Sequence, residues 1–397
     1  MSGDAATRAV ASVAARAGGG WRRGAGIALG VVAAAGVAGV AIERLTVSRG
    51  VRREARLALD AAGPYGTLRG TPSTALAEDG TALYYEVDEP EPGAAAAGVT
   101  VVFSHGFCLN QDSWHFQRAA LRGAVRTVHW DLRGHGRSGR GAPGEPVTID
   151  RLGRDLRAVI DAAAPEGPLV LVGHSTGGMT VMALAEQYPE LVRDRVVGVA
   201  LVGTSAGRLA EVDYGLPAAG AYAVHRVLPG ALRVLGGRAE LTELVERGRR
   251  ATADLFTGVV KRYSFAGREV DPAVARFAER MIEATPFEVV AEFHPAFAAH
   301  DKTAALARFA GLPVLVLAGE QDLITPPGHS EAVAEALPDA ALVLLPEAGH
   351  LVMLEHPAAV TDRLLELLAR AGAVPAATTV DGYGTKRAAS GTAGDDG

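Results

Sequence analysis

Short apolar runs alternate with helix-like segments along residues 74–372 of the chain. Each run has the length of a strand, and several are apolar throughout, as strands buried on both faces of a sheet are. This alternation predicts an α/β fold, in which a mostly parallel central sheet is flanked by helices. The predicted strands are residues 82–87, 99–103, 127–130, 169–172, 197–202, 314–317 and 342–345.

The alternation stops over about residues 205–304, where the pattern indicates helices interrupted by glycine and proline. Apolar positions recur there at helical spacing, for example in residues 241–246 and 274–278. We interpret residues 205–304 as a helical cap inserted into the α/β domain. Residues 373–397 are rich in Gly, Ala, Thr and Asp without an apolar period, which predicts a disordered tail.

Residues 24–42 carry no charge and reach the length of a helix that crosses a bilayer, about 20 residues. We predict a single-pass N-terminal membrane anchor, with a flexible terminus before it over residues 1–23 and a linker after it over residues 43–73. Its many Ala and Gly residues leave two alternatives open: an export signal cleaved near residues 39–41, and a buried helix of a soluble protein. Arginines flank the segment on both sides, so the positive-inside rule assigns no orientation.

The composition of the 397-residue chain excludes several kinds of partner. The formal net charge of -6 provides no basic field, so we predict no nucleic-acid partner. The chain has one cysteine, Cys108, which excludes an internal disulfide and a cysteine-based metal cluster. We interpret Cys108 as a small buried apolar residue. The histidines lack metal-binding spacing, so the sequence predicts no metal site and no cofactor.

The pattern Gly-x-Ser-x-Gly at residues 173–177 follows the apolar run 169–172 and precedes a helix-like segment. A serine on a sharp turn between a strand and a helix presents its hydroxyl as a nucleophile, so Ser175 is the candidate nucleophile. The same pattern recurs at residues 203–207, but Gly and Pro follow it within about two helical turns. We therefore favour Ser175 over Ser205.

A serine nucleophile needs a base and an acid that orients the base. His350 is the candidate base because it follows the last predicted strand, and open α/β sheets place their sites at the carboxyl ends of strands. Asp322, directly after the preceding strand, is the candidate acid. We interpret Glu320 and Glu347 as solvated loop charges, and His356, beside the start of a helix, as a structural neighbour.

Hydrolysis also requires hydrogen-bond donors for the developing oxyanion. The backbone N–H of Thr176, directly after the nucleophile, is one candidate, and the N–H of Phe107, in the loop after an earlier strand, is the second. His105 is expected to hold this loop by a hydrogen bond rather than to transfer protons. Trp114 and Phe116 are interpreted either as lining of an acyl pocket or as core.

Several of these segments, taken in order, resemble motifs of the α/β-hydrolase superfamily over about residues 76–368. The resemblance implies the α/β-hydrolase fold. It also implies that residues 131–138 form a structural loop beside the site without chemistry of its own. The matching motifs are residues 104–107, 131–138, 173–177, 319–322 and 349–350.

Finer details resemble one branch of this superfamily. The Gly-Phe pair at residues 106–107, the position of the cap and the Thr-Pro pair at residues 285–286 are similar to esterases and cofactor-free perhydrolases. Epoxide hydrolases and haloalkane dehalogenases of the superfamily carry an aspartate at the position of Ser175. Those two activities are therefore disfavoured.

These observations predict a serine hydrolase that cleaves small or medium carboxylic esters through an acyl-enzyme intermediate. The expected partner is a small-molecule ester. One alternative uses the same triad for acyl transfer or for perhydrolase or haloperoxidase-like chemistry. The other is a non-catalytic binding protein, which has no need for triad residues at separate strand ends. Neither the natural substrate nor the oligomeric state follows from the sequence.

Overall fold

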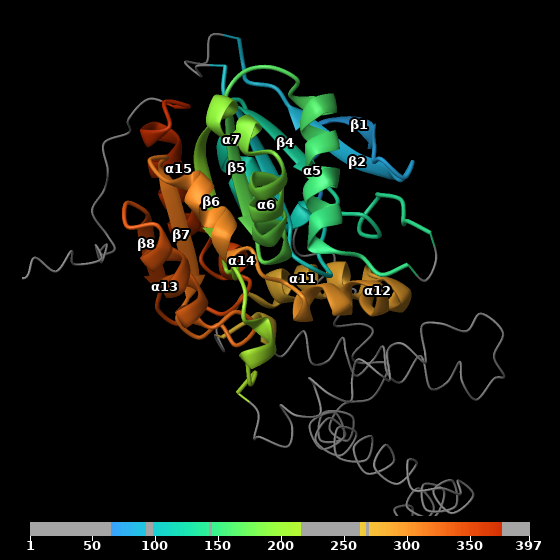
Figure 1. Ribbon diagram of the computed structural model, residues 1–397, viewed down its shortest axis with the longest axis vertical. Helices are drawn as coiled ribbons and strands as arrows, with labels where there is room; N and C mark the ends of the chain where they lie inside the picture. Colours follow the sequence, from blue (N-terminus) through green and yellow to red (C-terminus); the bar gives the residue numbers. More distant parts are fainter. Residues whose placement is uncertain (1–64, 93–97, 143–144, 216–262, 267–269, 375–397) are drawn as a thin grey trace, which may run out of the picture. The chain divides into compact units, whose positions relative to one another are not determined.

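The computed structural model describes residues 65–92, 98–142, 145–215, 263–266 and 270–374 (Figure 1). The chain divides into two compact units, residues 1–55 with 213–259 and residues 56–212 with 260–397. The second unit contains nearly all described residues and carries the fold described below. The predicted flexible terminus, membrane anchor and most of the predicted linker and tail lie outside the described residues.

An eight-stranded sheet forms the centre of the second unit, in the order β1-β2-β4-β3-β5-β6-β7-β8. Strand β2 runs antiparallel to β1 and β4, whereas all other neighbouring pairs are parallel. This architecture confirms the predicted α/β class. The strands are β1 Thr71–Leu76, β2 Ala82–Asp88, β3 Thr100–Ser104, β4 Arg126–Trp130, β5 Leu169–His174, β6 Val196–Val202, β7 Val314–Gly319 and β8 Ala341–Leu345.

Helices cover both faces of this sheet (Figure 1). Helices α5 and α6 pack against each other over the sheet, and α4 and α15 form a separate packed pair. Strands β3, β5 and β7 are buried along their whole length, as strands covered on two faces must be. The helices are α4 His115–Leu121, α5 Ile149–Ala163, α6 Thr176–Gln187, α7 Pro189–Arg195, α13 Pro327–Ala336, α14 Val352–Glu355 and α15 Pro357–Arg370.

Strand β1 lies across the predicted boundary at residue 74, so the sheet begins inside the segment interpreted as a linker. Its sequence, Thr-Pro-Ser-Thr-Ala-Leu, is mostly exposed and lacks an apolar alternation. An edge strand needs to bury only a few side chains, and it tolerates a proline such as Pro72. The apolar pattern therefore missed it.

Two helices are described within the predicted cap, α11 Pro272–Ala284 and α12 Phe287–Ala298. The side chain of Asp271 caps α11 by accepting a hydrogen bond from the Ala273 N–H. Thr285 and Pro286 separate the helices, because a proline disfavours the helical conformation in the residue before it. Both helices lie beyond the end of the sheet where the parallel strands terminate (Figure 1).

No helix among the described residues is long and apolar enough to cross a bilayer. The described helices are short, and they belong to the fold around the sheet and to the predicted cap. The anchor predicted over residues 24–42 lies outside this part of the chain and stays a prediction.

Strand β2 places two carboxylates in the core, where one arginine pairs with both. The Arg118 guanidinium contacts Asp88 at 2.6 Å and Glu86 at 2.7 Å, and all three side chains are buried. By contrast, Arg126 pairs with Glu89 at 3.1 Å near the surface. Removing one member of a buried ion cluster leaves uncompensated charge, whereas an exposed pair contributes little.

We therefore expect Arg118→Met to lower the free energy of unfolding by about 3–5 kcal/mol. The matched variant Arg126→Met is expected to lower it by less than about 1 kcal/mol. Urea denaturation followed by circular dichroism measures both. Equal losses in the two variants would contradict the role assigned to the buried cluster.

Candidate active site

Ser175 occupies the turn between β5 and α6 with backbone angles φ 52° and ψ -118°. A positive φ is strained for a residue with a side chain, so surrounding contacts must hold it. The Ser175 N–H donates to the Val202 carbonyl at 2.9 Å, and the Thr204 hydroxyl donates to the Ser175 carbonyl at 2.7 Å. Strand β6 and the loop directly after it thus fix both sides of the turn.

Close approach of the backbone explains the glycines around this serine. A Cβ at Gly177 would collide with the Ser104 carbonyl at the end of β3. A Cβ at Gly106 would lie 3.2 Å from the Cβ of Ser175. The loop after β3 therefore packs directly against the turn, which brings the predicted oxyanion loop beside the predicted nucleophile.

Asp322 and His350 meet beyond the carboxyl ends of β7 and β8. Their Oδ2 and Nδ1 atoms lie 2.8 Å apart. The Asp322 carboxylate also accepts hydrogen bonds from the N–H groups of Ile324 and Thr325 and from the Thr325 hydroxyl, at 2.8 to 2.9 Å. Burial opposes ionisation, but His350 and these donors lower the pKa of Asp322 below its usual value. The ionised carboxylate then places the imidazole proton on Nδ1 and leaves Nε2 as the basic atom.

Hydrogen bonds between side chains and main-chain atoms connect the loop that carries His350 to the rest of the domain. The His350 carbonyl accepts a hydrogen bond from the His174 ring at 2.9 Å. Glu355 accepts the Gly349 N–H at 2.7 Å and also the Ala266 N–H at 3.1 Å. The carboxylate therefore joins this loop to the described residues 263–266, which lie inside the predicted cap.

Two buried histidines hold the loop after β3. His105 accepts the Leu132 N–H at Nε2 and bonds the Gly106 carbonyl through Nδ1, at 2.9 and 2.7 Å. His135 accepts the Cys108 N–H at 3.1 Å. His105 thus has the hydrogen bonds expected of a structural residue, and Cys108 is buried with a raised pKa caused by that burial. The Thr176 N–H lies in the first turn of α6, where backbone donors lack partners within the helix.

The cap helix α12 contacts the Phe107 side chain. Phe293 stacks on the Phe107 ring with centroids 5.3 Å apart, and Phe297 meets it edge-on at 5.1 Å. Phe293 is fully buried. Trp114 is also buried completely, packed on Phe103 at 5.2 Å, which places it in the core.

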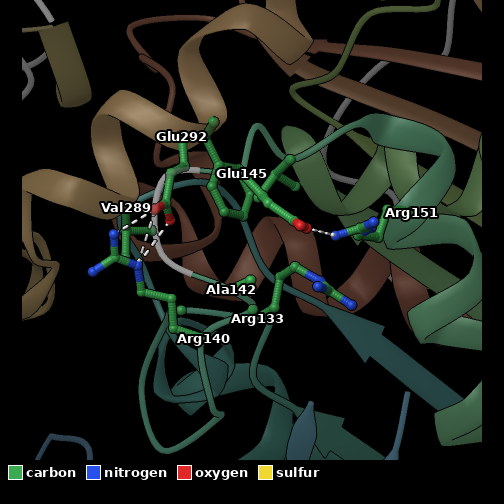
Figure 2. Close-up of a pocket in the computed structure, with 11 residues that line it drawn as sticks. Arg133, Arg140, Ala142, Glu145, Arg151, Val289 and Glu292 are labelled. Carbon is green, nitrogen blue, oxygen red and sulfur yellow. Dashed lines mark hydrogen bonds and ion pairs between the residues drawn. The ribbon is translucent and has the colours of Figure 1, made fainter. Parts of the chain in front are cut away.

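A hollow lies between α12 and the loop after β4, and Phe293 is part of its wall (Figure 2). Figure 2 shows Arg140 bonded to Glu292 and Arg151 bonded to Glu145. Arg133, also in its wall, is paired with Asp155. Because carboxylates already pair these guanidinium groups, the hollow lacks free positive charge for an anion, and no triad candidate lines it.

The competing candidates lie away from the Asp322–His350 pair. Ser205 is fully buried, and its Oγ is held by the Gly207 carbonyl at 2.5 Å and by the His329 ring at 2.8 Å. Glu320 and Glu347 are exposed. The ring of His356 approaches the Glu347 carbonyl at 3.5 Å. Of the four, Ser205 does contact a histidine ring, but its hydroxyl is fully buried and is already donated to the Gly207 carbonyl.

Sequence reasoning did not identify His174, Thr204, Thr325 or Glu355 as contacts of the site. Each acts on a main-chain or side-chain atom of a residue that was identified. His174 carried the only available signal, since it stands beside the nucleophile in the Gly-x-Ser-x-Gly pattern. Thr204 lies in the second Gly-x-Ser-x-Gly pattern, in which the serine was the only candidate considered.

The strand order is that of an α/β fold, and the strained serine turn and the Asp–His contact both lie at the carboxyl edge of its sheet, where such folds place their sites. The family described as alpha/beta hydrolase fold matches residues 99–357. This match covers more than half of the chain. The chain therefore belongs to the α/β-hydrolase family and is a hydrolase, which confirms the resemblance seen in its motifs.

Individual relatives are more distant. The chain is 28% identical over 267 residues to 3-oxoadipate enol-lactonase 2 of Acinetobacter baylyi, covering 65% of this chain and 84% of the relative. It is 27% identical over 274 residues to the dihydrolipoyllysine-residue acetyltransferase component of the acetoin cleaving system of Pseudomonas putida, covering 68% of this chain. That match spans 64% of the acetyltransferase component, so a third of the relative has no counterpart in it.

Solved structures give the same family. A thermophilic esterase from Thermogutta terrifontis superposes with a TM-score of 0.59 and 26% identity, over 76% of this chain and 99% of the esterase. The enol-lactonase from Burkholderia xenovorans LB400 superposes with a TM-score of 0.59 and 28% identity, over 75% of this chain and all of the enzyme. Both neighbours match along nearly their whole length.

Buried neutral histidines surround the site and line the sheet. Burial lowers the pKa of His135 to about 4 and that of His174 to about 3, and it lowers the pKa values of His105 and His129 well below the usual range. Unfolding returns each imidazole to a pKa near 6.5. Below pH 6.5 the unfolded chain therefore binds more protons at these sites, so their contribution to stability is lost as the pH falls. Asp131, whose pKa burial raises to about 6, acts in the opposite direction.

His129 offers a test of this linkage, because its ring stacks on Phe103 with centroids 4.7 Å apart and an interplanar angle of 9°. We expect His129→Phe to keep the stack and to remove one titrating group. Between about pH 6 and pH 4, the free energy of unfolding of this variant should fall less steeply than that of the wild type, by about 1.4 kcal/mol per pH unit. Urea denaturation across this range provides the slopes, and parallel slopes would contradict the neutral buried state.

Proposed function

We propose that this hydrolase cleaves carboxylic esters through an acyl-enzyme intermediate, with Ser175 as nucleophile, His350 as base and Asp322 as the orienting acid. The observation that carries the proposal is the 2.8 Å contact between Asp322 and His350, whose main chain is bonded by His174, the residue before the strained Ser175 turn. A carboxylate that fixes the imidazole tautomer, next to a serine held on a sharp turn, is the arrangement that acyl transfer requires.

The first half-reaction forms the acyl-enzyme. Nε2 of His350 accepts the Ser175 hydroxyl proton as Oγ attacks the ester carbonyl carbon, and the carbonyl electron pair moves to oxygen. The N–H groups of Phe107 and Thr176 are assigned to this oxyanion. Collapse of the intermediate breaks the bond to the alcohol oxygen, which takes the proton from His350.

Water then repeats the sequence. His350 accepts a proton from water as the water oxygen attacks the acyl carbon, and the Ser175 oxygen leaves with that proton. The products are a carboxylic acid and an alcohol. In a lactone, which is a cyclic ester, both products stay in one molecule.

The named activities of the similar proteins support this choice of substrate. The structural neighbours include an esterase and an enol-lactonase, and both names describe cleavage of an ester bond. The cap of about 100 residues predicted from the sequence favours a small or medium acyl group over a long chain. The aromatic cluster of Phe107, Phe293 and Phe297 gives the region beside the oxyanion loop an apolar wall.

Acyl transfer is the second candidate. It is favoured by the 27% identity to an acetyltransferase component, which covers 68% of this chain. Transfer uses the same acyl-enzyme and differs only in the group that attacks it. Measuring how the acyl group divides between water and an added alcohol or thiol separates the two activities.

We expect Ser175→Ala to lower hydrolysis of p-nitrophenyl acetate by at least about 10³-fold, because no other group can form the acyl-enzyme. Ser205→Ala is the matched control, since it removes the serine of the second Gly-x-Ser-x-Gly pattern. Its rate is expected to stay within a few fold of the wild type. A full rate in Ser175→Ala, or its loss in Ser205→Ala alone, would overturn the assignment.

We expect Asp322→Asn to lower kcat by about 10³–10⁴-fold, because an amide can hold the imidazole in the wrong tautomer. Glu320→Gln, which removes an exposed carboxylate two residues away, should leave kcat almost unchanged. Steady-state kinetics with p-nitrophenyl acetate measures both variants. If the losses were reversed, Glu320 would be the acid.

A further inference from the structure

His174 precedes the nucleophile, and its ring lies between the main parts of the site. The side chain is fully buried. Its Nε2 atom lies 2.9 Å from the carbonyl oxygen of His350, and the two rings lie 4.8 Å apart at their centroids. A carbonyl only accepts, so the His174 proton resides on Nε2 and is donated to the main chain of the candidate base.

The strand order shows that this contact joins two parts of the site that the sheet itself does not connect. Ser175 follows β5 and His350 follows β8, and β6 and β7 lie between these strands in the sheet. No ladder hydrogen bond therefore joins the strand of the nucleophile to the strand of the base. The bond from His174 spans this gap directly, from the residue next to the nucleophile to the base itself.

The opposite edge of the ring faces the oxyanion loop. A Cβ at Gly106 would lie 2.5 Å from Nδ1 of His174, so the ring packs tightly against that glycine. Nδ1 receives no hydrogen bond from the described part of the chain. One imidazole thus contacts the base loop through a hydrogen bond and the oxyanion loop through packing, while its backbone continues into the serine turn.

Electrostatics keeps this ring neutral. Burial, together with the neighbouring His350, lowers the pKa of His174 to about 3. The ring is therefore neutral at neutral pH, and its hydrogen bond to the His350 carbonyl keeps the proton on Nε2. A second positive charge does not form beside His350 when His350 takes up the serine proton.

We propose that His174 is a positioning residue, whose hydrogen bond to the His350 carbonyl sets the base at working distance from the serine turn. This role rests on the proposed catalytic functions of Ser175 and His350. His174 touches neither substrate nor reacting atoms; it acts through the main chain of the base. A displacement of the base by about 1 Å is enough to slow the reaction by about 10²-fold.

Two nearly isosteric substitutions separate the hydrogen bond from the volume. His174→Gln keeps an N–H donor at about the reach of Nε2, whereas His174→Met fills the space without one. We expect kcat of His174→Met to fall by about 10- to 100-fold with KM changed less than about twofold. His174→Gln should restore kcat to within about threefold of the wild type.

The rates are measured on the full-length chain with p-nitrophenyl acetate and divided by the number of active sites, counted by a fluorophosphonate that labels Ser175. This division removes any loss that arises from misfolded protein. The proposal is overturned if kcat per active site in His174→Met equals that of the wild type. It is also overturned if His174→Gln is as slow as His174→Met.

A measurement on the wild type decides the matter should both variants fail to fold. In ¹⁵N-histidine NMR at pH 7, the His174 ring is expected as the neutral Nε2–H tautomer. An Nδ1–H tautomer or an imidazolium would overturn the proposal. Absence of fluorophosphonate labelling at Ser175 in the folded wild type would instead overturn the proposed function, and the positioning role with it.

Discussion

The Ser175 turn requires three chain segments to approach more closely than side chains permit. Strand β5 enters it, helix α6 leaves it, and the loop after β3 lies against it. Glycines at positions 106 and 177 make this approach possible, and hydrogen bonds with β6 and with Thr204 in the loop after it hold the strained serine. The candidate site depends on this packing, because the loop after β3 lies against the turn and His174, directly before the turn, bonds the loop of His350.

The protonation states of the groups in the candidate site follow from their burial. Histidines 105, 135 and 174 are buried and stay neutral, and each uses a ring nitrogen to hold a main-chain atom. Ionised Asp322 is different, since backbone N–H groups and a hydroxyl satisfy its oxygens. Burial therefore keeps these three imidazoles neutral, whereas the imidazole of His350 has a carboxylate partner in Asp322.

Sequence patterns predicted the features that depend on neighbouring residues in the chain. Apolar runs identified the strands of the buried sheet, and a position at a strand end pointed to Asp322 and His350. Edge strand β1 was missed because it buries few side chains. The contacts of His174 and Glu355 were missed for another reason: they join segments far apart in the chain, and no periodicity states which carbonyl or N–H a side chain will meet.

Helix α12, in the predicted cap, packs against the same loop after β3. Neighbouring residues of this helix face different partners: Glu292 pairs with Arg140 on the loop after β4, while Phe293 stacks on Phe107. The Val147 N–H adds a bond to the Glu292 carbonyl at 3.0 Å. A helix held from two directions cannot move toward the sheet without straining one set of contacts. Two sets of contacts therefore hold the aromatic wall beside the loop after β3, and under the proposed function an acyl group bound there would have to match the space that Phe293 leaves.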